Sequence, residues 1–149
     1  MRYLAFALAI SCSQTQVQRQ ATAAHETAIS INTIALPALE AAYRAEQYSA
    51  LQTACSDGCD RAEALGAVLP VRQRWDPVWA SAEAVRLAHG VWADELEICR
   101  RLPLDGGVCG PSVAEASVRV VRAILVYRCS LRAAGESGLD KFTGDILCP

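Results

Sequence analysis

Apolar residues recur at alternating steps of four and three along this chain, and this spacing constrains the fold more than any other feature. The clearest stretches are Val17, Ala21, Ala24, Ala28, Ile31 and Ala35; Val78, Ala82, Val85, His89, Trp92, Leu96 and Cys99; and Val113, Ser117, Val120, Ile124, Tyr127 and Leu131. Such steps place side chains on one face of an α-helix, and no strand-like alternation of useful length accompanies them. We therefore predict an all-α protein, an antiparallel bundle of three main helices.

The first predicted helix is long and interrupted by a proline. Pro37 ends the first apolar face, and the pattern continues on a shifted face from Ile34 to Cys55. Because proline removes a backbone N–H and clashes with the preceding turn, we expect a helix that is kinked at Pro37. Ser56-Asp57-Gly58 then predicts a break in the helix.

Capping residues predict where the remaining helices begin and end. Asp60 opens a short helical piece that we expect to stop between residues 66 and 70. Asp76-Pro77 predicts a helix start, with Asp as the N-cap and Pro at the first helical position. Ser112-Val-Ala-Glu115 is a capping box, so the third helix is expected to begin there and to stop near Gly135.

A second apolar face on the third helix predicts that this helix is buried on two sides. That face consists of Val118, Val121, Leu125 and Cys129. We therefore expect the third helix to lie at the centre of the bundle. A chain of 149 residues suits one domain. We divide it into a long first helix or stalk (12–56), a second helical region with its loop (57–111), and a third helix with an irregular tail (112–149).

The charge pattern and the absence of known motifs exclude several classes of function. The formal net charge is −2 and no basic run occurs, so the sequence lacks the cluster of basic residues that nucleic-acid-binding proteins carry. The chain contains no G-x-S-x-G, P-loop, dinucleotide-binding or H-E-x-x-H motif. We expect no enzymatic activity, no catalytic residue, no cofactor, no resident metal and no nucleic-acid partner.

The amino terminus has the order of an export signal. Met1-Arg2 is a positive start, residues 3–10 form an uncharged apolar run, and Ser11-Cys12 follows. The run is far shorter than the ~20 residues that span a bilayer. A small residue directly before a cysteine resembles the lipobox of bacterial lipoproteins, although Ala9 stands where that family prefers Leu. The resemblance implies that residues 1–11 are a signal peptide and that Cys12 is lipidated.

The same resemblance implies a location and a membrane attachment. The protein would be held by its lipid on the periplasmic side of the bacterial cell envelope. Ser13, at the second position after cleavage, permits sorting to the outer membrane by analogy with the family. Two or three acyl chains on Cys12 give stable anchoring, whereas a single chain does not.

The number of cysteines supports an oxidising compartment. The chain has seven cysteines, and lipidation of Cys12 leaves an even set for three disulfides: Cys55, Cys59, Cys99, Cys109, Cys129 and Cys148. One arrangement joins Cys99 to Cys109 across a turn-rich loop, Cys129 to Cys148 in the tail, and Cys55 to Cys59. The last bond requires Gly58 to break the helix, because i and i+4 side chains on a regular helix run parallel. Pairing across helices is the alternative.

Candidate ligand-binding residues lie on the second helical region. His89 lies beside Trp92 in the apolar seam, with carboxylates on the same helix, so it could serve as a ligand or a base. The simpler interpretation is a histidine that is hydrogen-bonded to a neighbouring helix. Trp75, Trp79 and Trp92 could line a ligand groove or a partner interface, although core packing is again the simpler interpretation. His25 lies on a polar stretch and is expected to be solvated.

A second resemblance is loose and covers residues 74–93. The segments Arg74-Trp75-x-Pro77-Val78-Trp79 and Ala88-His89-x-x-Trp92-Ala93 resemble small helical proteins of phages and prophages, most of which lack an assigned function. Our hypothesis is an envelope lipoprotein that acts as a structural or interaction component, through a protein partner or self-association. If the chain is phage-encoded, the role is in lysis or in modification of the host envelope. The alternative is a periplasmic helical protein that binds a small ligand or metal near His89 and Trp92.

Overall fold

The computed structural model describes residues 22–101, 109–135 and 148 of the chain, and all structural statements below concern these residues. Residues 22–30 are helical and lead into a π-helical turn, η1 (Ile31–Ala35), and then into α2 (Leu36–Ala54). Two longer helices follow, α3 (Arg61–Arg101) and α4 (Cys109–Ala133). The described residues contain helices and no strands, so the predicted all-α, disulfide-bearing class is confirmed.

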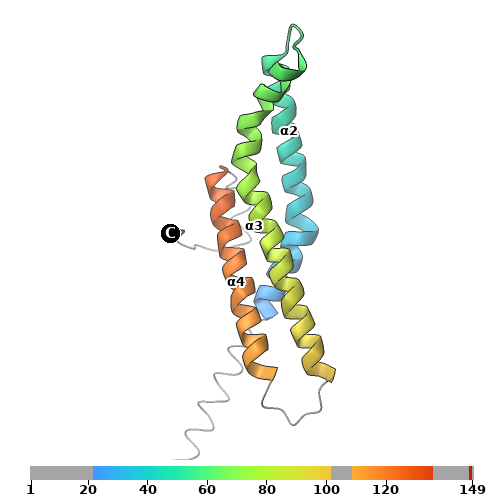
Figure 1. Ribbon diagram of the computed structural model, residues 1–149, viewed down its shortest axis with the longest axis vertical. Helices are drawn as coiled ribbons and strands as arrows, with labels where there is room; N and C mark the ends of the chain where they lie inside the picture. Colours follow the sequence, from blue (N-terminus) through green and yellow to red (C-terminus); the bar gives the residue numbers. More distant parts are fainter. Residues whose placement is uncertain (1–21, 102–108, 136–147, 149) are drawn as a thin grey trace, which may run out of the picture.

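The helix α3 lies in the middle of the molecule. It packs against α2 and η1 on one side and against α4 on another. In Figure 1 the chain runs along α2 to one end of the molecule, turns, and returns along α3, with α4 beside the lower part of α3. With 41 residues, α3 is about 60 Å long. The helix that was predicted to be central, the one expected to begin at Ser112, is α4. That prediction is wrong, because α3, which is the longest helix, packs against both of its neighbours.

The predicted break at residues 56–58 is confirmed, and its geometry is local. Gly58 has a φ of 93°, a backbone conformation that other residues rarely adopt. A disulfide joins Cys55 to Cys59 across this turn, with 5.0 Å between their Cα atoms. The condition stated for this bond, that Gly58 breaks the helix, is thus met.

A capping box at Asp60 begins α3. The Asp60 Oδ1 accepts hydrogen bonds from the backbone N–H groups of Ala62 (2.8 Å) and Glu63 (2.9 Å). In return, the Glu63 carboxylate accepts a 3.0 Å hydrogen bond from the backbone N–H of Asp60. These bonds satisfy donors that have no partner inside the helix.

The helix α3 is continuous through two prolines, which corrects the sequence prediction. Pro70 and Pro77 both lie inside it, so the helix neither stops between residues 66 and 70 nor restarts at Asp76-Pro77. A proline inside a helix costs about 3 kcal/mol. Trp75 and Val78 are fully buried on this stretch. Most helical stability comes from such packing, and here it outweighs the local proline penalty.

The region before Pro37 departs from regular α-helix without ending. The backbone stays helical from residue 22 to residue 54, and the N–H of Leu36 bonds to the carbonyl of Ile31, five residues earlier. Such π-helical turns occur where the regular ladder of hydrogen bonds is interrupted, as it is at a proline. The kink expected at Pro37 stays a prediction, and residues 12–21 of the expected stalk lie outside the described part of the chain.

The core is one continuous cluster that connects the helices along α3. Its buried apolar side chains are Ala24, Ala28, Ile31, Leu39, Trp75, Val78, Ala82, Val85, Trp92, Ala116, Val120, Ile124, Tyr127, Leu131 and Ala134. Most members from α3 and α4 belong to the predicted 4-3 seams. Within the described residues, none of the helices carries an apolar stretch long enough to cross a membrane.

The helix α4 is buried on one face, so the predicted two-sided burial is wrong. Val118 and Val121, from the expected second buried face, are 58% and 41% exposed. All of the fully buried α4 side chains lie on the opposite face, toward the rest of the bundle. The helix begins at Cys109, earlier than the expected start at Ser112, and its predicted end is confirmed by Gly135, which has a φ of 85°.

Candidate functional site

Two of the predicted ligand-binding residues, His89 and Trp92, lie together in a cluster with His25. The Nδ1 of His25 and the Nε2 of His89 are 2.7 Å apart, which is a hydrogen bond between the helical segment 22–30 and α3. The His25 ring centroid lies 4.8 Å from the centroids of both His89 and Trp92. His25 is half-buried rather than solvated, so the expectation for that residue is wrong, whereas the hydrogen bond from His89 to a neighbouring helix is confirmed.

The electrostatics of this cluster favour the uncharged form of His89. Burial is the main cause that lowers the pKa of His89, and the positive charge that His25 can carry lowers it further. A hydrogen bond between two imidazole nitrogens needs one donor and one acceptor, so it breaks if both of the facing nitrogens carry a proton. The indole Nε1 of Trp92 is buried beside them and has no hydrogen-bond partner among the described residues.

The His25–His89 pair supplies two nitrogens that could face a metal or a small polar ligand. Zinc in a structural site takes four protein ligands and in a catalytic site three. Among the described residues, no three His, Cys, Asp or Glu side chains gather as such a site requires. The pair can therefore hold a proton or contribute two ligands to an open site, but it does not form a closed metal centre by itself.

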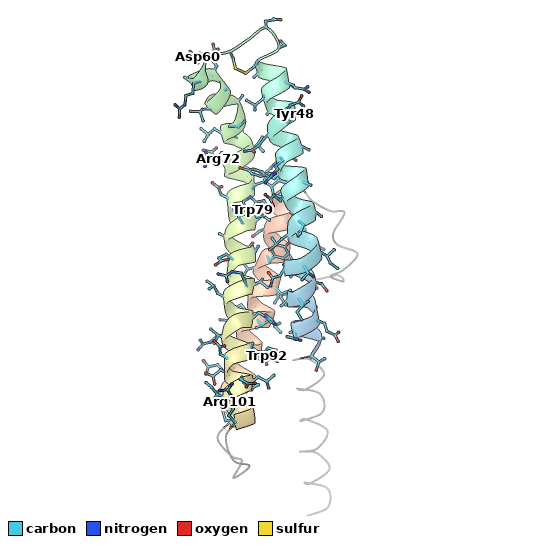
Figure 2. The ribbon with its side chains drawn as sticks, turned by 90° about the vertical axis from the view of Figure 1, so that its right-hand side faces the viewer. Tyr48, Asp60, Arg72, Trp79, Trp92 and Arg101 are labelled. Atoms are coloured by element: carbon cyan, nitrogen blue, oxygen red, sulfur yellow. A yellow bond between two sulfur atoms is a disulfide. The ribbon has the colours of Figure 1, made fainter. Side chains whose placement is uncertain are left out.

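The third predicted ligand-binding residue, Trp79, lies apart from the histidines. Its ring packs with Trp75 at a centroid distance of 5.9 Å and with Tyr43 of α2 at 5.8 Å. In Figure 2 the labels of Trp79 and Trp92 mark different levels along α3. Trp79 thus serves the α2–α3 contact, which matches the simpler interpretation of core packing.

A polar cluster that the sequence did not reveal connects α2 to α3. The Glu46 carboxylate forms an ion pair with Arg74 and accepts a 2.8 Å hydrogen bond from the indole Nε1 of the fully buried Trp75. Because Glu46 lies 28 residues from Arg74 and 29 from Trp75 in the sequence, no local sequence motif predicts the contact.

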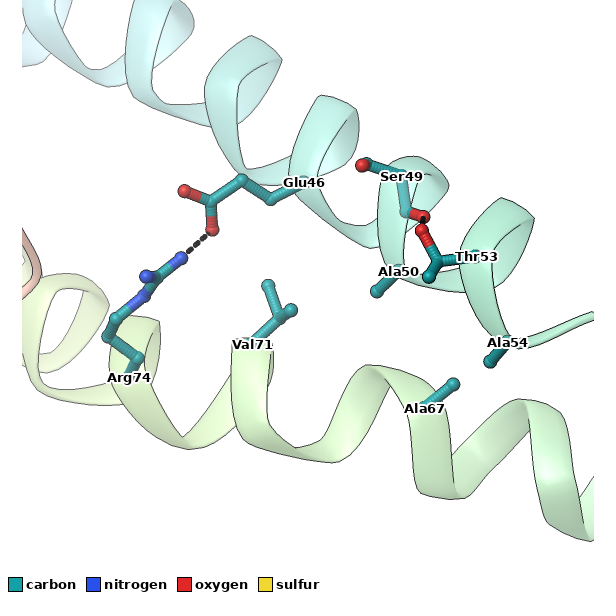
Figure 3. Close-up of a pocket in the computed structure, with 8 residues that line it drawn as sticks. All are labelled: Glu46, Ser49, Ala50, Thr53, Ala54, Ala67, Val71 and Arg74. Atoms are coloured by element: carbon teal, nitrogen blue, oxygen red, sulfur yellow. Dashed lines mark hydrogen bonds and ion pairs between the residues drawn. The ribbon is translucent and has the colours of Figure 1, made fainter.

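A cavity of about 470 Å³ opens beside this ion pair, between α2 and α3 (Figure 3). Small side chains leave the space: it is lined by Ala50, Ala54, Ala67, Val71, Ser49 and Thr53, with Glu46 and Arg74 at one end. The hydroxyl of Thr53 donates to the carbonyl of Ser49 and is therefore engaged within its own helix. Apart from the Glu46–Arg74 pair, the lining offers few groups that could hold a ligand.

The outward side of α3 carries an apolar stripe that faces solvent. Its apolar members are Ala80, Ala84, Leu87, Val91 and Ile98, and we refer to them as the outer face of α3. They follow the steps of four and three residues, except that the charged Asp94 occupies the position between Val91 and Ile98. Leu87, Val91 and Ile98 are 55%, 46% and 53% exposed. This second pattern lies on the same helix as the inner seam and was not among the sequence predictions.

Two of the predicted disulfides are present. Cys55 bonds to Cys59, and Cys129 bonds to Cys148 over a separation of 19 residues. Cys99 is also disulfide-bonded. The side chain of Cys109 and all of Cys12 lie outside the described residues, so the lipidation of Cys12 stays a prediction.

Comparison with models of protein families, with curated proteins and with solved structures found no match for this chain.

Proposed function

We propose that this protein is a lipid-anchored component of the bacterial cell envelope that works by contact with other proteins or with its own copies. The observation that carries this proposal is the outer face of α3. Apolar side chains spaced at 4-3 steps on an exposed helix form the kind of surface that a second helix covers. The described part of the chain leaves Leu87, Val91 and Ile98 uncovered.

The disulfides support the proposed compartment. The bond Cys55–Cys59 fixes a turn, and the bond Cys129–Cys148 joins Cys148 to α4. Disulfides persist in oxidising compartments, such as the bacterial periplasm, and are rare in a reducing cytosol. A lipid on Cys12 would hold the bundle at a membrane surface in that compartment, with the outer membrane preferred because of Ser13.

The anchor is tested by expressing the full chain in a bacterium and separating membrane from soluble fractions. The intact mass, taken without reduction, should correspond to a chain that begins at Cys12, carries acyl groups and lacks six hydrogens. A Cys12→Ser variant should lose the acyl mass and leave the membrane fraction. A soluble, unprocessed wild-type chain with free thiols would contradict both the anchor and the compartment.

The interaction surface is tested by placing charge on the outer face of α3. A Leu87→Glu/Val91→Glu double variant should fold normally, because both side chains are exposed, and should lose cross-links formed from a photoreactive residue at position 98. The matched control is Val126→Glu, a change of an equally exposed apolar residue on α4. If the double variant and the control give the wild-type cross-links, the outer face of α3 is not the interaction surface.

A role in lysis or in modification of the host envelope is part of this proposal for the case that the chain is phage-encoded. Deletion of the gene should then delay lysis or change the permeability of the host envelope. Unaltered lysis timing and envelope integrity would exclude a role in lysis or envelope modification, but would not contradict the proposed interaction role.

A second candidate function rests on the 2.7 Å contact between His25 and His89 beside Trp92. Two imidazole nitrogens next to an aromatic ring could bind a small polar ligand or chelate a transition metal together with water. Zinc, copper or nickel ions should then raise the melting temperature of the wild type and leave that of His89→Ala unchanged. An equal response in both chains would exclude this site.

A further inference from the structure

Acidic side chains border the outer face of α3. Asp76, Glu83 and Glu97 are separated by seven residues or a multiple of seven, so they lie along one edge of the apolar stripe, and all three are exposed. We refer to them as the acidic edge. Asp94, which is also exposed, interrupts the stripe itself. Residues 76–99 contain five acidic residues and one arginine, which gives this segment a net charge of −4 with histidine neutral.

The helix α3 compensates these charges only in part. Glu83 forms an ion pair with Arg86, and Glu97 forms one with Arg101, both within α3. Asp76 and Asp94 form no ion pair within the part of the chain that the structure describes. Charges of opposite sign across a helix contact favour it, and charges of the same sign oppose it. The face therefore selects a partner that brings positive charge.

A second copy of the chain does not bring this positive charge. In an antiparallel pair of copies that aligns the whole stripe, the heptad geometry places Glu83 of one copy opposite Glu97 of the other. In a parallel pair in register, Asp94 faces its own equivalent inside the contact. Both arrangements bring carboxylates together, so the charges disfavour self-association through this face.

An anionic lipid surface is disfavoured by the same carboxylates. Amphipathic helices that lie on such surfaces carry lysine and arginine on their polar side, which attract the lipid head groups. The acidic edge and Asp94 would instead repel them.

We propose that the outer face of α3 binds a basic amphipathic helix of another protein, whose apolar residues cover the stripe and whose lysine or arginine side chains face the acidic edge and Asp94. The stripe from Ala80 to Ile98 is about 27 Å long, which corresponds to roughly three heptads of a partner helix. This inference rests on the proposed function, since that function uses the same face, and it adds the chemistry of the partner.

The test is a fluorescence anisotropy titration of two labelled peptides with the full-length oxidised chain carrying Cys12→Ser, so that no lipid binds the peptides. Both peptides are helices of three heptads with leucine at the core positions, and the flanking positions hold lysine in one and glutamate in the other. Like charges at these positions keep each peptide from pairing with itself. The lysine peptide should bind at one molecule per chain, more weakly as salt screens the charges, and the glutamate peptide should not bind.

Variants of the chain locate the binding on the outer face. Glu83→Gln/Glu97→Gln should bind the lysine peptide about fourfold more weakly, because two partly exposed charge pairs are lost. The matched control is Glu40→Gln/Glu115→Gln, which removes two exposed carboxylates with similar ion pairs on α2 and α4 and should leave the affinity unchanged. Leu87→Gln/Val91→Gln should abolish binding, because it removes apolar surface without adding charge.

The proposal is overturned if the glutamate peptide binds as tightly as the lysine peptide, or if the two glutamine double variants have the same affinity. It is also overturned if the chain alone sediments as a dimer that Leu87→Gln/Val91→Gln dissociates, because the face then serves a second copy. Binding of the chain to phosphatidylglycerol vesicles through this face would overturn it as well. None of these outcomes contradicts the proposed function, which fails separately if the cross-links from position 98 do not respond to Leu87→Glu/Val91→Glu.

Discussion

The carboxylate of Glu46 on α2 accepts a 2.8 Å hydrogen bond from the indole nitrogen of Trp75, a side chain of α3 that is fully buried. The same carboxylate forms an ion pair with Arg74, the residue before Trp75. One acidic side chain thus satisfies a buried donor and neutralises a half-exposed cation, and it fixes how α2 lies against α3.

We predict that Glu46→Ala is more destabilising than Glu46→Gln. Alanine leaves the indole N–H of Trp75 buried without a partner, which costs about 1–3 kcal/mol, whereas glutamine keeps an oxygen that can accept this bond. The ion pair with Arg74 is partly exposed and contributes little by comparison. Urea denaturation followed by far-UV circular dichroism measures both variants. Equal stability of Glu46→Ala and Glu46→Gln would mean that the Trp75 hydrogen bond is unimportant.

The two described disulfides are predicted to differ in their contribution to stability. In the chain-entropy model a bond that closes a longer loop stabilises more. Cys55 and Cys59 are separated by 4 residues and Cys129 and Cys148 by 19, which corresponds to about 2 and about 3 kcal/mol. We therefore expect the Cys129→Ser/Cys148→Ser pair to lower the melting temperature more than Cys55→Ser/Cys59→Ser. The reverse order would show that the tight turn at Gly58, rather than loop length, sets the contribution.

The features that the sequence predicted correctly are those with short-range causes. The break at residues 56–58 follows from Gly58, the end of α4 from Gly135, and the Cys55–Cys59 bond from the break between its two cysteines. The inner seams of α3 and α4 were predicted for the same reason, since a 4-3 spacing is a property of one helix and needs no knowledge of its neighbours.

The features that the sequence missed depend on contacts between distant residues. The helix α3 continues through Pro77 because Trp75 and Val78, which lie before and after this proline in the sequence, are buried in the core. A rule based on capping residues takes no account of such packing. The His25–His89 bond joins residues 64 positions apart. No pattern within a helix predicts which histidine of another helix will meet it.

The His25–His89 pair predicts a dependence of stability on pH. The pKa of His89 is lowered in the folded protein, so the unfolded chain, in which histidine titrates near pH 6.5, takes up this proton first as the pH falls. The free energy of unfolding should therefore be constant above this value and decrease as the pH falls through and below it. In His89→Gln this decrease should be smaller. Denaturation midpoints between pH 5 and pH 8 measure it, and parallel curves for the two proteins would rule out His89 as the cause.

Two glycines with the same open surroundings are predicted to respond in opposite ways to alanine. A Cβ added at Gly58 or at Gly90 meets no atom within 4 Å, so steric contact with neighbouring atoms does not oppose alanine at either position. Gly90 lies inside α3, where alanine is the better helix former, and Gly90→Ala should stabilise the protein by about 0.5–1 kcal/mol. Gly58 has a φ of 93°, so Gly58→Ala should destabilise it by about 1–2 kcal/mol. Thermal unfolding of the two variants under oxidising conditions gives the sign of each effect. If Gly58→Ala were as stable as the wild type, the turn beside the Cys55–Cys59 bond would not require the left-handed backbone conformation.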